Sequence, residues 1–148
     1  MRSLGLLILR LVIGGLFVIH GYPKLFGGKG TGDALEESTR KALGDGFAEQ
    51  MEYGGIESVT GFMSSLDIPN PQAAAWALTL AEFGGGLALI AGFKTRPVAT
   101  ALAFSQAVAI AKVDGERGLV GGYEFNAALI GSTLALAIGG PGKISLDG

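Results

Sequence analysis

The stretch LGLLILRLVIGGLFVIHGYPKLFGG (residues 4–28) decides the fold, because only Arg10 interrupts its apolar character before His20. A membrane-spanning helix needs about 20 residues, with a range of ~17–25. The apolar run reaches that length by continuing past Pro23, since a proline bends a membrane helix rather than ending it when neighbours satisfy the freed carbonyl. We therefore predict a first membrane span over residues 4–26. It is a retained helix rather than a signal peptide, because Arg10 breaks the apolar core and no small-residue cleavage site follows.

Three further apolar segments follow the first one, and they are rich in alanine and glycine. Such small side chains let membrane helices pack closely. A soluble four-helix bundle would need a polar face on every helix, yet the second segment offers only Thr79 and Glu82. We predict an all-α fold, a four-transmembrane-helix bundle in a single domain (residues 1–148), with spans at residues 4–26, 73–93, 97–113 and 123–139.

Composition supports a membrane protein and excludes several classes of function. Of the 148 residues, 49% are hydrophobic and 16% are charged, below the roughly 25% charged residues of soluble domains. The absence of cysteine excludes disulfides and thiolate metal sites, and a single histidine cannot build a His-rich metal centre or a bis-imidazole haem site. The net charge of −2 gives no reason to expect nucleic acid. We expect the lipid bilayer as partner, and no metal.

Loop charges predict the orientation. Basic residues in short loops mark the cytoplasmic side, and Arg2, Lys94, Arg96 and Lys143 all fall on the side of the two termini. The long first loop, on the other side, is acidic: residues 20–72 hold eight acids and four bases. We predict a multi-pass protein with cytoplasmic N- and C-termini.

The long first loop also contains helical patterns. Acids at positions 36 and 37 precede bases at positions 40 and 41 by four residues, as in a solvated helix. In IESVTGFMSSL (residues 56–66), Ile56, Val59, Leu66 and either Phe62 or Met63 share one helical face. This pattern predicts a short amphipathic helix on the bundle mouth or in the membrane interface.

Ionisable residues inside the spans are the candidate functional groups, because charges at membrane depth are costly and usually face the bundle interior. At 100° per residue, Arg10, Phe17, Gly21 and Lys24 stay within about 40° of one direction on the first helix. Counting along the spans places both Arg10 and Glu82 near the middle, so we predict that they pair. A polar vestibule is expected to lead to this pair from the outer side, built from His20, Lys24, Lys112, Tyr123, Glu124 and Asn126.

Each of these groups also has a purely structural interpretation, which the sequence leaves open. A buried Arg–Glu pair can simply fix helix register, and a lysine near a span end can snorkel to the interface. An acid in a first helical turn is favoured there by the helix dipole, and a buried amide can join two helices. The register interpretation applies to Arg10 with Glu82, and the snorkelling interpretation applies to Lys24 and Lys112. The helix-dipole interpretation applies to Glu124, and the helix-joining interpretation applies to Gln106. His20 would be a cap or interface residue.

Three stretches, LLILRLVIGGLFVIHGYPKLFG, SLDIPNPQAAAWALTLAEFGGGLALIAGFKTRPVA and GGYEFNAALIGSTLALAIGGPGKISLD, resemble the DoxX family of bacterial membrane proteins. The resemblance covers nearly the whole chain, in the same order. The first loop, at residues 30–57, is longer than the common form. The matching residues are Arg10, His20, Gly21, Lys24 and Leu25; Ala81, Glu82, Gly85 and Gly86; Thr95 and Arg96; Tyr123 and Glu124; and Gly140–Gly142, Leu146 and Asp147.

The resemblance implies a four-helix protein of the bacterial inner membrane, related to a subunit of thiosulfate:quinone oxidoreductase. Our hypothesis is a membrane subunit of a quinone-linked oxidoreductase that works within a larger complex or a homo-oligomer. Quinone is the expected cofactor, bound by Arg10, His20, Lys24, Gln106 and Tyr123. The expected catalytic residues are His20 as donor and Glu82 and Glu124 as proton relays, provided that burial raises the pKa of each carboxylate.

Two alternatives stay open at this point. In the first, the chain is a non-catalytic scaffold or assembly subunit, and its buried charges only fix packing. In the second, the polar vestibule is a pathway for an ion or a small molecule, which four short helices give little room to form.

Overall fold

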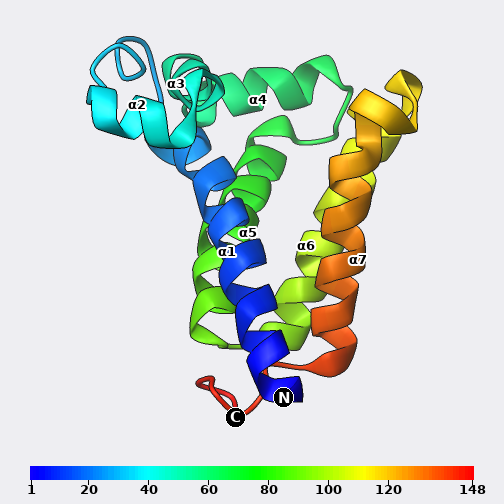
Figure 1. Cartoon of the computed structure of the whole chain (residues 1–148). Helices are drawn as coiled ribbons and strands as arrows, with labels where there is room; N and C mark the ends of the chain where they lie inside the picture. The colour runs from blue at the N-terminus through cyan, green and yellow to red at the C-terminus, as the bar shows by residue number, and fades with distance from the viewer. The chain divides into compact units, whose positions relative to one another are not determined.

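The computed structural model describes residues 1–148 and is built from helices alone (Figure 1). The predicted all-α class is confirmed. The elements are α1 (Arg2–Phe26), α2 (Glu37–Leu43), α3 (Asp45–Glu52), α4 (Ile56–Ser65), α5 (Pro71–Ala91), α6 (Thr95–Ala109), η1 (Ile110–Asp114), η2 (Gly115–Arg117), η3 (Leu119–Tyr123) and α7 (Glu124–Gly139).

Three helices are long and apolar enough to cross a membrane: Arg2–Phe26, Pro71–Ala91 and the continuous helical run Thr95–Arg117. They correspond to the first three predicted spans. Helix α7 covers most of the fourth, but it has only 16 residues, fewer than the roughly 20 of a typical span. Three membrane spans are therefore supported by length and composition, and the fourth stays a prediction.

The chain forms two compact units, one of Met1–Val18 with Gly84–Gly148 and the other of Ile19–Phe83. In the first unit, α1 and α5 approach closely at glycines. A Cβ on Gly14 would lie 2.7 Å from the carbonyl oxygen of Gly86, and one on Gly86 would lie 2.8 Å from the amide nitrogen of Val18. Backbone thus packs on backbone, as small residues allow between membrane helices.

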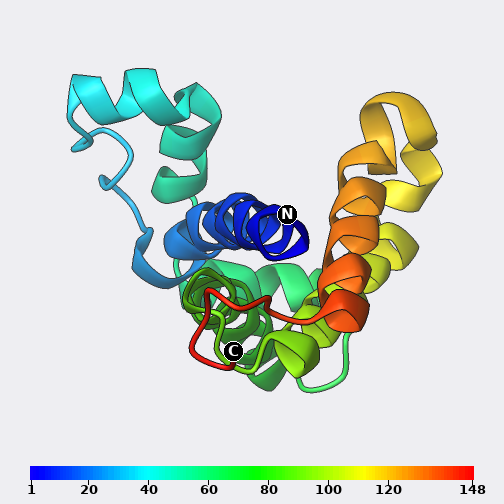
Figure 2. The ribbon, with the colours of Figure 1, turned by 60° about the horizontal axis from the view of Figure 1, so that its bottom comes forward.

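Helices α6 and α7 lie side by side in this unit (Figures 1 and 2). Their buried residues include Leu102 on α6 and Leu129 and Leu136 on α7. The chain reverses between the two helices at Gly118 and Gly121, which have φ values of 77° and 73°. Glycine adopts such a left-handed backbone without the steric cost of a Cβ.

In the second unit, α4 packs against the start of α5. Val59 and Met63 are buried together with Ala75, and Leu78 packs against them. The predicted amphipathic helix is therefore confirmed, and Met63 rather than Phe62 belongs to its buried face. Phe62 is half exposed. Helix α2 has no buried residue, as predicted for a solvated helix.

An aromatic cluster fixes α3, which the sequence did not predict as a helix. The Phe47 ring on α3 lies 6.4 Å from that of Tyr22 on α1, and Phe26 meets Phe83 of α5 edge-on at 5.7 Å. Such ring pairs stabilise a fold beyond the area they bury. The first loop is therefore a packed structure that returns to α1.

The glycine contact between α1 and α5 gives a matched pair of substitutions. Gly14→Ala forces a methyl group against the Gly86 carbonyl, whereas nothing lies within 4 Å of a Cβ on Gly15. We expect Gly14→Ala to destabilise the detergent-solubilised protein by about 1–3 kcal/mol through overpacking. Gly15→Ala should be neutral or stabilising, because alanine is the better helix former. Thermal unfolding by circular dichroism checks both, and equal melting temperatures would contradict the close packing.

Candidate functional site

Arg10 caps the end of a neighbouring helix. Its Nε donates to the Leu89 carbonyl at 2.9 Å and its NH2 group to Ile90 at 3.2 Å, both at the end of α5. The last carbonyls of a helix lack intrahelical partners. The NH1 group donates to the carbonyls of Pro141 and Ile144 in the C-terminal segment. With only 1% of its surface exposed, Arg10 joins three parts of the chain through backbone oxygens.

The C-terminal segment continues this cluster. The amides of Leu146 and Asp147 donate to the carbonyls of Ala91 and Gly92, each at 3.1 Å. The Asp147 carboxylate accepts the Thr95 amide at 3.2 Å, at the first residue of α6. An acid at this end of a helix is favoured by the unpaired amides and the dipole. Gly92 leaves room for the guanidinium, since a Cβ there would lie 2.9 Å from the Arg10 Cζ.

The predicted Arg10–Glu82 pair is wrong, because each residue has another partner. Arg10 bonds Leu89 and Ile90, and Leu89 lies seven residues beyond Glu82, about 10 Å along an α-helix. Counting residues from the ends of the spans gave the right helices and the wrong register. The predicted inward stripe on α1 is confirmed, since Arg10, Phe17 and Gly21 are buried and Lys24 is half-buried.

The partner of Glu82 is Lys24. The Lys24 Nζ lies 2.7 Å from a Glu82 carboxylate oxygen and donates to the His20 carbonyl at 3.1 Å. The Glu82 side chain is 8% exposed and that of Lys24 is 26% exposed. A buried ion pair is costly to break by removing one partner, because the other charge is left uncompensated. Lys24 is therefore held by an ion pair with Glu82 and by one hydrogen bond to a backbone carbonyl.

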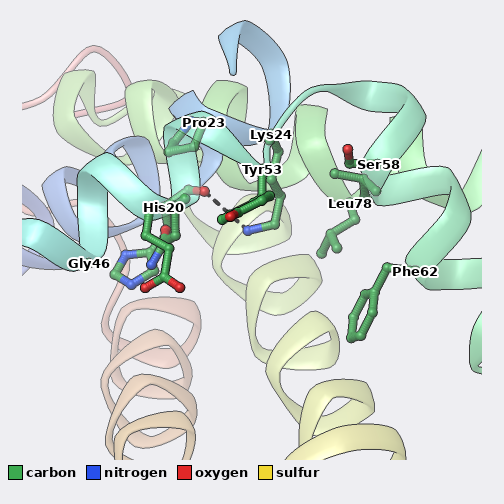
Figure 3. A pocket seen from close by; sticks show the side chains of 12 residues that line it. His20, Pro23, Lys24, Gly46, Tyr53, Ser58, Phe62 and Leu78 are labelled. Atoms are coloured by element: carbon green, nitrogen blue, oxygen red, sulfur yellow. Dashed lines mark hydrogen bonds between the residues drawn. The ribbon is translucent and has the colours of Figure 1, made fainter. Parts of the chain in front are cut away.

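A pocket of about 640 Å³ opens beside Lys24 (Figure 3). One part of its wall comes from α1 and α5, and the other part comes from the long first loop. The lining residues are His20, Pro23 and Lys24 of α1, Gly46, Glu49, Gln50, Tyr53 and Gly54 from α3 and the turn after it, Ser58, Val59 and Phe62 of α4, and Leu78 of α5. Polar and apolar groups thus face the same space.

Sequence reasoning placed His20 and Lys24 together in a polar vestibule, and both line this pocket, but it missed the wall from the first loop. The wall is held to α1 through backbone atoms, as the Gly55 amide donates to the Pro23 carbonyl at 3.0 Å and the Gly28 amide donates to Met51 at 2.7 Å. A Cβ on Gly54 would clash with the Pro23 carbonyl. In the sequence, this close backbone contact is marked only by the paired glycines at 27–28 and 54–55.

Glu52 organises the glycine-rich stretch GGKGTGD (residues 27–33). Its carboxylate accepts the amides of Gly30 and Gly32 at 2.7 and 3.1 Å. These hydrogen bonds, that of Gly30 foremost, lower the pKa of Glu52, and Lys29 adds to the effect. A loop of this composition has free amides suited to an anion, and here the anion is a side chain of the same protein.

The remaining predicted site residues lie in the other compact unit, where their contacts are structural. Gln106 is buried and accepts a hydrogen bond from Asn126 across α6 and α7 at 3.0 Å. Exposed Glu124 accepts the Gly121 amide at 3.1 Å in the first turn of α7. Tyr123 precedes that turn, and Lys112 is exposed. Their predicted convergence with His20 and Lys24 stays a prediction.

Long apolar helices that bury a guanidinium and a Lys–Glu pair define a multi-pass helical membrane protein. Residues 5–115 match the DoxX family model, and the chain belongs to this family. It is 29% identical to inner membrane protein YphA of Escherichia coli (strain K12), over 99% of this chain and 90% of that protein. It is 31% identical to YqjF, an inner membrane protein of the same organism, over 99% and 92%. No solved structure matches.

The contacts of Arg10 predict that a positive charge without the guanidinium hydrogen bonds does not keep the protein stable. Arg10→Lys keeps the cation but cannot reach four carbonyls, so the amides of Leu146 and Asp147 should lose hydrogen-exchange protection. We expect a loss of about 2–4 kcal/mol in stability, because buried acceptors are left unsatisfied. Arg2→Lys, at an exposed position on the same helix, is the control. Unchanged exchange in the C-terminal segment would contradict the cluster.

The Glu52 contacts predict an acid-sensitive loop. Because its pKa is lowered in the folded state, its contribution is present above the ordinary carboxylate pKa of about 4.3. That contribution is lost as the pH falls through the lowered folded value. The amide proton shifts of Gly30 and Gly32 should titrate together in this acidic range by NMR. Glu52→Gln should abolish the transition, whereas Glu37→Gln should leave it intact.

Proposed function

We propose that this chain is a four-span inner-membrane subunit of a quinone-linked oxidoreductase, with cytoplasmic termini. The pocket beside Lys24 and Glu82 holds the headgroup of the quinone. Family membership and the two inner membrane relatives support the location. The observation that carries the function is the Lys24 ammonium, fixed by Glu82 at the wall of a pocket.

The pocket suits a quinone headgroup in size and chemistry. Ligand pockets usually span about 300–1,000 Å³ and combine apolar walls with a few placed polar groups. Here Val59, Phe62 and Leu78 supply apolar surface next to the Lys24 ammonium. A quinone carbonyl needs a hydrogen-bond donor, and the Lys24 ammonium has three N–H groups, of which one donates to the His20 carbonyl.

Residues of the chain bind the quinone headgroup and transfer protons to it. A bound quinone supplies an acceptor for two electrons and two protons, and the electrons come from a partner subunit or a soluble reductant. Lys24 orients the headgroup and Glu82 holds Lys24. His20, at the same wall, is placed to pass protons inward from the loop side. Tyr123 provides a second polar contact to the quinone, and Glu124 relays protons.

A non-catalytic scaffold is the second candidate, and a specific observation favours it. Arg10, Gln106 and Glu124 all make bonds that hold helix ends or helix pairs together. Those three residues need no ligand to explain them. In this reading the packed first loop docks a larger complex.

Quinone binding distinguishes the two candidates. Decylubiquinone should bind the purified protein in lipid nanodiscs, and His20→Ala should weaken it. Lys24→Met combined with Glu82→Gln removes both charges, leaves no buried charge unpaired, and should weaken binding at least tenfold, since a hydrogen bond to a charged group contributes about 1.5–3 kcal/mol. Lys41→Met, on solvated α2, is the matched control. Wild-type affinity in the double variant would exclude this pocket, and no binding by the native protein would favour the scaffold.

A further inference from the structure

The two compact units carry opposite charge. Ile19–Phe83 contains nine acidic and four basic residues, whereas the rest of the chain contains four acidic and seven basic ones, with histidine counted as neutral. The pocket lies wholly within the acidic unit. Charges of one sign around a cleft determine which ions it concentrates and which it repels.

At the pocket wall itself, no positive charge is left uncompensated. Lys24 is the one lysine or arginine that lines the pocket, and Glu82 neutralises it at 2.7 Å. Glu49 adds an exposed carboxylate for which no basic partner is found. Gln50, Tyr53 and Ser58 supply neutral polar groups next to it. A ligand entering the pocket therefore meets a net negative charge.

We infer that this pocket selects uncharged amphipathic ring compounds and excludes anions, with Glu49 as a residue that determines specificity. The inference rests on the proposed function, since it concerns the same site. An anion would be attracted by the Lys24 ammonium, but Glu82 already neutralises that charge. The Glu49 carboxylate would in addition repel the anion. A small inorganic anion that served as reductant would have to deliver its electrons elsewhere, on a partner or another surface.

Two quinones, one uncharged and one anionic, test the inference. Decylubiquinone is uncharged, and 1,2-naphthoquinone-4-sulfonate is an anion. Dissociation constants for both are measured in nanodiscs of uncharged lipid, at about 10 mM and about 1 M salt, where the screening lengths are ~30 and ~3 Å. The variants are Glu49→Gln and Glu37→Gln, which remove the same charge inside and outside the pocket wall. Glu37 lies on solvated α2, so its replacement leaves the pocket intact.

The native protein should bind the uncharged quinone about tenfold more tightly than the sulfonate at low salt, and this preference should shrink at high salt. Glu49→Gln should tighten sulfonate binding about threefold and leave decylubiquinone unchanged, as expected for one screened charge at ~7 Å in water. Glu37→Gln should change neither. Equal affinities for the two probes, or a sulfonate affinity insensitive to Glu49→Gln, would overturn the inference while the proposed function stands. Failure of both probes to bind would overturn both.

Discussion

The close approach of α1 and α5 at glycine residues is the constraint on which the other contacts depend. In one unit Gly14 packs on the carbonyl of Gly86, and in the other Gly21 leaves no room for a Cβ beside the backbone of Phe83. Each contact fixes the register of two antiparallel helices locally. Arg10 therefore meets the last carbonyls of α5, and Lys24 meets Glu82. Bulkier side chains would separate the helices and detach both polar groups from their partners.

A bilayer offers no water to satisfy a polar group, so the protein must supply every partner. Arg10 shows one solution, because its N–H groups are directed to backbone carbonyls at the end of α5 and in the C-terminal segment. Lys24 differs, because its side chain is partly exposed and lines a pocket. This difference separates the two cations: the hydrogen bonds of Arg10 all go to backbone oxygens of the protein, while Lys24 faces a pocket next to its ion pair with Glu82.

The sequence predicted what depends on periodicity and failed where backbone geometry decides. Helical spacing identified the inward face of α1 and the buried face of α4, because apolar burial follows the helical period. It misplaced the partner of Glu82, since counting from a span end ignores where glycines let two helices touch. It missed the loop wall because the Glu52 carboxylate is bonded to main-chain amides and Gly55 is bonded through its own amide to a main-chain carbonyl. Such contacts show no periodic pattern of residue types, and only the paired glycines at 27–28 and 54–55 mark them in the sequence.

Under the proposed function, α1 and α5 supply the ion pair of the pocket and the long first loop supplies the residues that determine its selectivity. Lys24 and Glu82 come from α1 and α5, whose packing would fix the pair whatever the loop did. Glu49, Tyr53 and Phe62 come from the loop, which is tied down independently by the Glu52 hydrogen bonds and the aromatic cluster. A shorter loop on the same two helices would leave this ion pair beside a different wall. Under the proposed function, a change in the loop is therefore expected to change which ligand binds, while the pair on α1 and α5 stays in place.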